Sequence, residues 1–203
     1  MSAKTLDFWF EFASSYSYLS VMRIEPLARD AGVTINWRPF LLGPVFLSLG
    51  WNDSPFNIYP PKGRYMWRDL ARLAVRYRLP LRMPSQFPRN GLLAARVAIL
   101  GADKPWIGDF ARAAMSANFA DDRDIADPSV IHAILTRLGL PADALLADAT
   151  GEPNKLALRR QTERAGELGL FGAPSFITPD GELFWGNDRL EDALAWVADG
   201  PTI

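Results

Sequence analysis

The spacing of hydrophobic residues changes twice within the first forty positions. Apolar and polar side chains largely alternate over residues 5–12, which predicts a β-strand. From the serines at 14–17 onward, apolar residues recur at helical spacing, which predicts a helix with a kink at Pro26 and an end at Gly32. Alternation returns over residues 33–37. Together these elements predict a β-α-β unit with parallel strands and a right-handed crossover.

Residues 41–61 follow neither period. This segment is rich in Gly, Pro and Asn, and its length predicts a loop that takes part in ligand binding. Helical spacing then continues to about residue 150 with no strand pattern, which predicts a block of four helices. Their apolar positions are Met66, Leu70, Leu73 and Tyr77; Leu93, Val97 and Leu100; Trp106, Phe110 and Ala114; and Ile131, Ile134, Leu135 and Leu138.

The last quarter of the chain returns to a mixed pattern. A helix is predicted over about 153–168. Residues 176–178 and 183–185 then flank a Pro-Asp-Gly turn at 179–181, which predicts a β-hairpin, and a final helix follows. The predicted order is therefore β-α-β, helical block, helix, β-hairpin, helix.

Without the helical block, this order is that of a thioredoxin fold. We therefore predict an α/β protein in which a thioredoxin-like domain is interrupted by an all-helical insertion. The expected boundaries are 1–45 for the first part of the thioredoxin-like domain, 46–150 for the helical insertion domain and 151–203 for the second part.

The composition narrows the functional classes. Hydrophobic residues make up 49% of the 203 positions, enough for a buried core, and the net charge of −1 provides no basic field for nucleic acid. A run of about eighteen apolar residues that could span a bilayer is missing, so no membrane partner is expected. The first residues lack the apolar segment and cleavage site of a signal peptide, and a cytoplasmic protein is expected.

The chain has no cysteine and one histidine. It therefore cannot form a disulfide, a thiolate metal site or a cysteine nucleophile, and no bound metal is expected. Dithiol redox chemistry is excluded as well, because it needs protein thiols. Any sulfur chemistry must use a thiol from another molecule.

Hydroxyl side chains gather where the first strand meets the first helix, in FASSYSYLS. Ser14 or Ser15 suits the N-cap of that helix, which is an ordinary structural role. A hydroxyl at this place can also hold an anion, because the first amides of a helix are unpaired. Further on, FGAPSFI puts Pro174 directly before a strand. A trans Ala173–Pro174 bond is commoner in general, but the element order favours cis.

Five segments together resemble the 2-hydroxychromene-2-carboxylate isomerase family. They are DFWFEFASSYSYLS, INWRPFLLGPVF, PPKGRYMWRDLAR, FGAPSFI and FWGNDRLEDAL, and they cover essentially the whole chain in the family's order. The family is related to kappa-class glutathione transferases and, more distantly, to periplasmic disulfide oxidases of the DsbA type. The resemblance implies glutathione as cofactor, a small aromatic carboxylate as substrate and a homodimer.

The resemblance also implies roles for particular residues. Ser14 matches the family's active-site serine, which donates a hydrogen bond to the glutathione thiolate and lowers the pKa of the thiol. The backbone of Ala173, before Pro174, is expected to hold the peptide-like cofactor. Asn187 and Asp188 match the place that binds its γ-glutamyl end, although Asp188 with the Glu three residues later also resembles a helix capping box.

Three more residues are expected to contact ligands. Lys62 and Asn52 match the family's cofactor and substrate contacts, and Lys62 supplies a positive charge for a carboxylate. Arg64 lies nearest this segment among arginines spaced by four along one helix, and it is a candidate for holding an anionic substrate. The interpretation of that arginine series as a solvated face is the simpler one.

The function implied is a glutathione-dependent isomerase in aromatic-compound degradation, which interconverts 2-hydroxychromene-2-carboxylate and trans-o-hydroxybenzylidenepyruvate or a close analogue. In this mechanism the thiolate adds to the conjugated substrate, a single bond rotates, and elimination returns the cofactor. Two alternatives stay open from the sequence. One is a kappa-like glutathione transferase or peroxidase for other electrophiles, and the other is a non-catalytic thioredoxin-fold binding protein.

Overall fold

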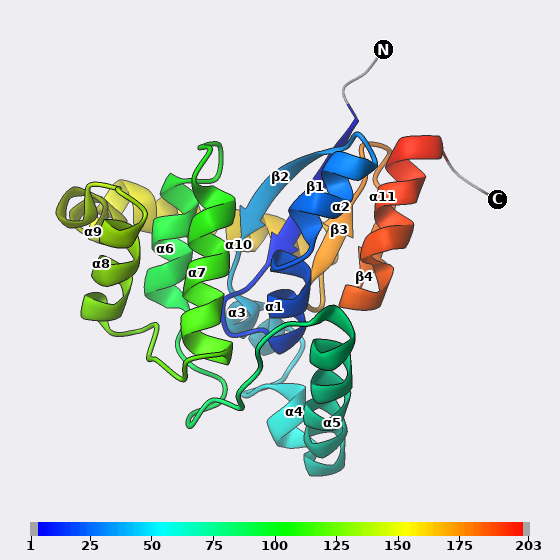
Figure 1. Ribbon diagram of the computed structural model, residues 1–203, viewed down its shortest axis with the longest axis horizontal. Helices are drawn as coiled ribbons and strands as arrows, with labels where there is room; N and C mark the ends of the chain where they lie inside the picture. Colours follow the sequence, from blue (N-terminus) through cyan, green and yellow to red (C-terminus); the bar gives the residue numbers. More distant parts are fainter. Residues whose placement is uncertain (1–3, 201–203) are drawn as a thin grey trace.

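The computed structural model describes residues 4–200 and builds them around a mixed sheet in the order β2-β1-β3-β4 (Figure 1). Strand β1 (Thr5–Phe10) pairs in parallel with β2 (Thr34–Pro39) and antiparallel with β3 (Ser175–Ile177). Strand β4 (Leu183–Trp185) completes an antiparallel hairpin with β3. The predicted parallel pair and the predicted hairpin are confirmed, and they form one sheet.

The crossover between β1 and β2 contains two helices, where one kinked helix was predicted. Helix α1 (Ser15–Val21) ends before a turn at Met22 and Arg23, and α2 (Ile24–Asp30) follows it. Pro26 lies in the first turn of α2, where its missing N–H costs no hydrogen bond. The chain therefore breaks before the proline and not at it.

The segment predicted as a loop over 41–61 contains two short helices, α3 (Leu42–Ser48) and α4 (Pro55–Ile58). Pro55 occupies the first turn of α4, and the Ser54 hydroxyl accepts a hydrogen bond from the Phe56 amide as its cap. The prediction of a loop was wrong because proline at the start of a helix does not oppose helix formation.

The helical block is confirmed, with one helix more than predicted. Its five members are α5 (Pro60–Tyr77), α6 (Leu92–Leu100), α7 (Ile107–Phe119), α8 (Pro128–Arg137) and α9 (Ala142–Thr150). After the block come α10 (Glu152–Glu167), the 3-10 turn η1 (Asn187–Arg189) and α11 (Leu190–Asp199). Within residues 4–200, none of the helices combines the length and the apolar character needed to cross a membrane.

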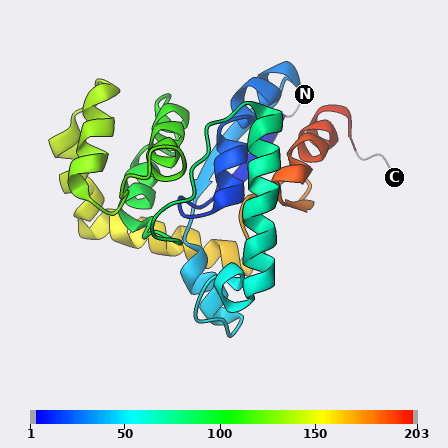
Figure 2. The same cartoon turned by 60° about the horizontal axis from the view of Figure 1, so that its bottom comes forward.

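Both faces of the sheet are covered. On one face, Phe8 stacks between Phe10 and Phe176, with ring centroids 5.2 and 5.3 Å away. On the other face, Trp9 packs with Phe40 and with apolar residues from α3 and α10. Helix α11 lies along β1 and β3, and Figure 2 shows α10 passing beneath the opposite side of the fold.

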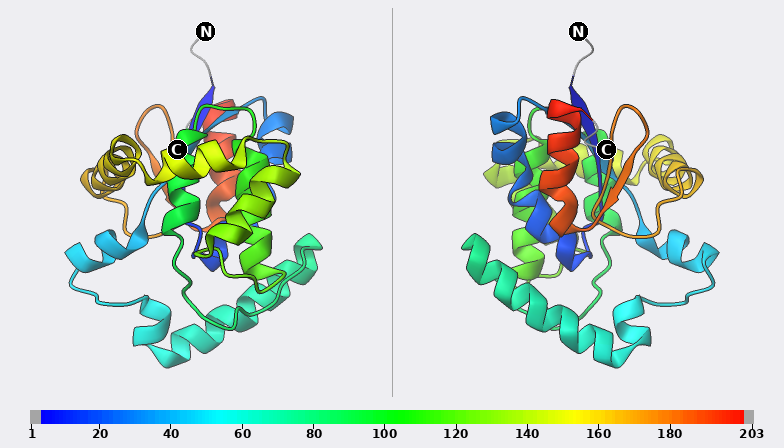
Figure 3. Two further views of the ribbon diagram at one scale, coloured as in Figure 1. Left: turned by 90° about the vertical axis from the view of Figure 1, so that its left-hand side faces the viewer. Right: turned by 90° about the vertical axis from the view of Figure 1, so that its right-hand side faces the viewer.

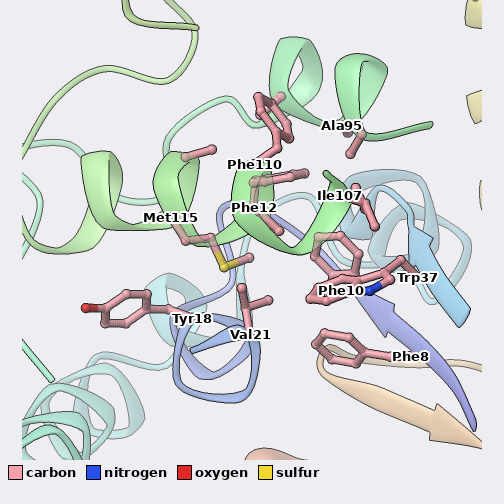
Figure 4. Close-up of a cluster of buried hydrophobic side chains, with 14 of the residues drawn as sticks. Phe8, Phe10, Phe12, Tyr18, Val21, Trp37, Ala95, Ile107, Phe110 and Met115 are labelled. Atoms are coloured by element: carbon pink, nitrogen blue, oxygen red, sulfur yellow. The ribbon is translucent and has the colours of Figure 1, made fainter. Parts of the chain in front are cut away.

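The helical block shares its core with the sheet. Phe12, just after β1, lies 5.4 Å from Phe10 and 6.0 Å from Phe110 of α7, measured between ring centroids (Figure 4). The Asn118 side chain of α7 also donates to the Phe12 carbonyl at 3.2 Å. The division at residues 45 and 150 stays a prediction, and the buried cluster continues across both parts.

Candidate functional site

A large cavity lies at the carboxyl end of β1, next to the start of α1. Its volume is about 1220 Å³, and its walls come from α3–α5, the segment before α6, and the turns before β3 and after β4. Figures 1 and 3 show α3–α5 extending beyond this end of the sheet. Cavities of roughly 300–1,000 Å³ usually hold one drug-sized ligand, so this cavity has room for a cofactor and a substrate together.

Ser14 reaches the cavity from the N-terminus of α1. Its oxygen caps the helix by accepting a hydrogen bond from the Ser17 amide at 3.2 Å, and its hydroxyl donates to the Ala173 carbonyl at 2.9 Å. The neighbouring Ser15 is 2% exposed and donates to the Met66 sulfur. Of the candidate caps, Ser14 is thus the one that fills this role, and its hydroxyl joins two segments far apart in the sequence.

The Ala173–Pro174 bond is cis, as the element order indicated. The Ala173 carbonyl accepts the hydrogen bond from the Ser14 hydroxyl. The Pro174 carbonyl accepts a hydrogen bond from the Gly186 amide at 2.9 Å. The turn before β3 and the turn after β4 are therefore tied together at the edge of the cavity.

Asn187 and Asp188 have different environments. The Asn187 side chain is buried, and its Oδ1 accepts hydrogen bonds from the Ser20 hydroxyl at 3.1 Å and from Arg23 at 3.2 Å. The side chain of Asn187 therefore holds the turn in place. Asp188 is exposed at the cavity, where its carboxylate lies 3.4 Å from Arg189.

The capping-box interpretation of Asp188 and Glu191 is wrong. Helix α11 begins after Arg189, and within residues 4–200 no side chain caps it. Glu191 instead pairs with Arg23, whose guanidinium also stacks over the Tyr77 ring at 3.7 Å. The Asp188 carboxylate thus remains available at the cavity surface.

Helix α5 presents one face to the cavity through Lys62, Tyr65, Asp69 and Leu73, which recur every three or four residues. Arg64 points away from this face by roughly half a turn and is not among the lining residues, so its contact with the substrate stays a prediction. Lys62 and Asn52 are exposed and line the cavity. The predicted ligand contacts of Lys62 and Asn52 therefore have a cavity beside them.

Tyr16 adds a polar contact to the same wall. Its hydroxyl donates to Asp69 at 2.9 Å. Burial and this hydrogen bond raise the pKa of Tyr16, so the phenol stays neutral. Sequence reasoning missed this pair, because the two residues are 53 positions apart and belong to different helices.

Aromatic side chains form much of the remaining wall. Phe171 and Trp185 pair at 4.8 Å on one side of the cavity, and Phe46 and Trp51 pair at 5.6 Å elsewhere in the lining. A side chain at Gly172 would collide with the Trp185 indole. Such walls suit a flat aromatic ligand.

Glu11 is a further residue of the cavity that the sequence pattern did not reveal. It follows β1, is 6% exposed and lines the cavity close to Ser14. Its carboxyl accepts a hydrogen bond from the Ala13 amide at 2.9 Å, yet burial raises the pKa of Glu11 to about 8. The one available signal is an acidic residue inside the apolar run FWFEFA.

The described residues contain no group of three or more His, Asp or Glu side chains placed to hold a metal ion. The site instead combines a helix-capping hydroxyl, a peptide bond before a cis-proline, and a roomy aromatic cavity. This arrangement on an α/β scaffold defines a thioredoxin-fold protein with a ligand cavity at the end of β1 and no cysteine of its own.

Comparison with known proteins supports this class. A model described as DSBA-like thioredoxin domain matches residues 5–195. The 2-hydroxychromene-2-carboxylate isomerase of Sphingobium xenophagum is 32% identical over 197 residues, which covers 97% of this chain and 99% of the relative. The chain therefore belongs to the DSBA-like thioredoxin family and, within it, to the 2-hydroxychromene-2-carboxylate isomerase family.

Two further similarities bear on the function. The solved structure of a 2-hydroxychromene-2-carboxylate isomerase superimposes with a TM-score of 0.83 at 27% identity, covering 92% of this chain and 90% of that one. Human glutathione S-transferase kappa 1 is 25% identical and covers 93% of this chain and 88% of its own length.

Proposed function

We propose that the protein is a glutathione-dependent isomerase that interconverts 2-hydroxychromene-2-carboxylate and trans-o-hydroxybenzylidenepyruvate, or a close aromatic analogue, in the degradation of aromatic compounds. The observation that carries the proposal is the Ser14 hydroxyl next to the Ala173–Pro174 peptide, inside a cavity large enough for two ligands. The kinship with named isomerases over nearly the full length of the chain supports the choice of reaction.

The residues at the cavity suit glutathione, a tripeptide with an ammonium group, two carboxylates and a thiol. The Asp188 carboxylate suits the ammonium group of glutathione, and the positive charge of Lys62 suits one of its carboxylates. The backbone of Ala173 suits a peptide ligand. Gly186 fits this arrangement, because a Cβ there would lie 2.5 Å from the Asp188 carboxylate. When bound, glutathione supplies a nucleophilic thiolate for a conjugated double bond.

Ser14 is placed to stabilise that thiolate. Its oxygen accepts from the Ser17 amide, so its hydroxyl, which donates to the Ala173 carbonyl, would be able to donate to a bound thiolate instead. The bond from the amide makes the hydroxyl a better donor. Ser14 therefore lowers the pKa of the thiol without becoming a nucleophile itself.

The remaining lining residues orient the substrate. Lys62 and Asn52 suit its carboxylate and the oxygen that gains charge during the reaction. Phe46 and Trp51 provide an apolar surface for its ring and keep water away from the reacting atoms.

The test is an assay of the purified protein with 2-hydroxychromene-2-carboxylate, with and without glutathione, beside chlorodinitrobenzene. Isomerisation that requires glutathione, with little conjugation of chlorodinitrobenzene, is expected. Fast conjugation without isomerisation would favour a kappa-like transferase, an alternative that the 25% identity to human glutathione S-transferase kappa 1 keeps in view. The absence of turnover of either compound would exclude both enzymes and favour the non-catalytic thioredoxin-fold binding protein.

A homodimer and a cytoplasmic location belong to the same proposal. Leu47, Leu49 and Val75 are 50–79% exposed apolar side chains on or next to α3 and α5, where a second copy would cover them. Sedimentation of the purified protein tests the assembly. A reducing compartment suits the proposal because it supplies reduced glutathione.

A further inference from the structure

The floor of the cavity, formed by Glu11, Ser14 and Ala173, contains a carboxyl without a charged partner, that of Glu11. The side chain is 6% exposed, and within residues 4–200 no lysine or arginine forms an ion pair with it. Its Oε2 accepts a hydrogen bond from the Ala13 amide at 2.9 Å. Its Oε1 faces Gly91, where a Cβ would come within 2.8 Å of it. The absence of a side chain at Gly91 therefore makes room for the buried Glu11 carboxyl.

Two charged residues of the cavity lining, Arg89 and Asp69, already have partners of their own. Arg89, from the segment before α6, pairs with Asp122 and donates to Asn118 of α7 at 3.2 Å. On the α5 wall, Asp69 accepts from Tyr16 and lies 3.6 Å from Arg72.

The cavity holds other charged groups as well. They are Lys62 on α5, Asp53 in the segment before α4, and Asp188 and Arg189 after β4. Burial is the largest cause of the raised pKa of Glu11, and none of these charges is among its causes. Below about pH 8, therefore, the carboxyl is protonated and neutral.

We propose that Glu11 is the acid–base partner of the cofactor thiol, so that the Glu11 carboxyl and the glutathione sulfur together hold a single proton across the neutral range. This inference rests on the proposed function, because it concerns the same bound thiol. Two negative charges in one buried site exclude each other, as in a pair of neighbouring carboxylates. The thiolate at Ser14 therefore forms while Glu11 keeps its proton, and ionised Glu11 must regain a proton when the thiolate binds.

Proton counting by isothermal titration calorimetry tests this coupling, with glutathione titrated into the protein in buffers of different ionisation heat. At about pH 6, Glu11 is protonated before and after binding, so wild type and Glu11→Gln release equal numbers of protons. At about pH 9, empty wild type has ionised Glu11, and it should release about one proton fewer than Glu11→Gln. Equal proton counts at both pH values would overturn the proposal.

Glu182→Gln is the matched control, because it makes the same chemical change at an exposed site in the β3–β4 turn. It should behave as wild type at both pH values. The absence of any binding heat at millimolar glutathione in wild type would overturn the proposed function, and this proposal with it. Binding with equal proton counts would overturn this proposal alone.

A second measurement needs no variant, in case Glu11→Gln does not fold. At about pH 7 ordinary carboxyls are ionised, so a protonated Glu11 should give a distinct carboxylic-acid band in the infrared spectrum. Glutathione should move the titration midpoint of this band upward by about two pH units or more. S-methylglutathione, which cannot form a thiolate, should move it less. Equal shifts with both ligands would contradict the proposed sharing of a proton.

Discussion

The floor and the outer wall of the cavity are built differently. The floor consists of Glu11, Ser14 and Ala173, which are buried or half-buried and joined by hydrogen bonds to other segments. The outer wall is the surface of α3–α5, where Leu47 is 70% and Tyr65 is 63% exposed. Hydrogen bonds fix the floor before a ligand arrives, whereas the wall presents large side chains to solvent. Changes to the floor should therefore act on kcat or on stability. Changes to the wall, or to Asp188 at the rim of the cavity, should act on KM for the ligand.

The largest effect is expected from Ser14→Ala. Loss of a hydrogen-bond donor to a developing charge costs about 100-fold or more in kcat. The variant also loses the α1 cap, which lowers the free energy of unfolding by about 1 kcal/mol. Steady-state isomerase kinetics and thermal unfolding measure both changes.

Ser17→Ala is the control for Ser14→Ala. The Ser17 hydroxyl is buried and has no hydrogen-bond partner among the described residues. Its removal should leave kcat within about twofold, because no bond to a ligand or to the protein is lost. Equal losses of kcat in the two variants would contradict a specific role of the Ser14 hydroxyl.

The second prediction concerns pH and stability. The Glu11 pKa rises from 4.5 in an exposed chain to about 8 in the folded protein, so between these values the folded state keeps a proton that the unfolded state has lost. The free energy of unfolding should therefore fall as the pH rises from about 4.5 to 8, by on the order of a few kcal/mol. Glu11→Gln should remove this contribution, as urea unfolding at several pH values would show. An unchanged pH dependence would contradict the raised pKa.

Two glycines compare the floor with the wall directly. In Gly91→Ala the new methyl group would meet Glu11 at 2.8 Å and the Phe12 Cβ at 3.1 Å, so a loss of roughly 1–3 kcal/mol in unfolding free energy is expected. In Gly43→Ala on α3 it would meet nothing within 4 Å, and a gain of up to about 1 kcal/mol is expected. Denaturant unfolding measures the free energy of unfolding of both variants. Similar changes in the two variants would contradict the expected difference between floor and wall.

The smallest effect is expected at the rim, from Asp188→Asn. An exposed charge pair with the cofactor ammonium contributes about 1 kcal/mol, so KM for glutathione should rise several-fold while kcat stays nearly constant. Asp192→Asn is the control, because Asp192 also pairs with Arg189 but lies one turn further along α11. A larger KM increase in Asp192→Asn would place the cofactor elsewhere.

The sheet and the long helices could be predicted because hydrophobic spacing reports burial directly. Leu6, Phe8 and Phe10 alternate along the sequence and are all fully buried. Helices α3 and α4 were missed, since their prolines and glycine resemble loop composition. The local sequence does not distinguish a proline in a first helical turn from one in a loop.

The positions of candidate site residues could be predicted where one short segment determines them. Ser14 and the Ala173–Pro174 bond occupy the expected places, although the sequence did not show that they are hydrogen-bonded to each other. The internal role of Asn187 depends on Arg23, which is 164 residues away. The burial of Glu11 depends on Gly91 and its neighbours. Local patterns contain no record of such distant contacts.

Ser14 occupies the strand-to-helix junction where a thioredoxin-like protein carries its redox cysteine. Under the proposed function, the reactive sulfur arrives and leaves with the cofactor. A glutathione molecule that is oxidised or alkylated is exchanged for a fresh one, whereas an overoxidised cysteine would inactivate an enzyme permanently. The working lifetime of the site during oxidative stress is then set by the supply of glutathione around it, and not by damage to a sulfur of its own.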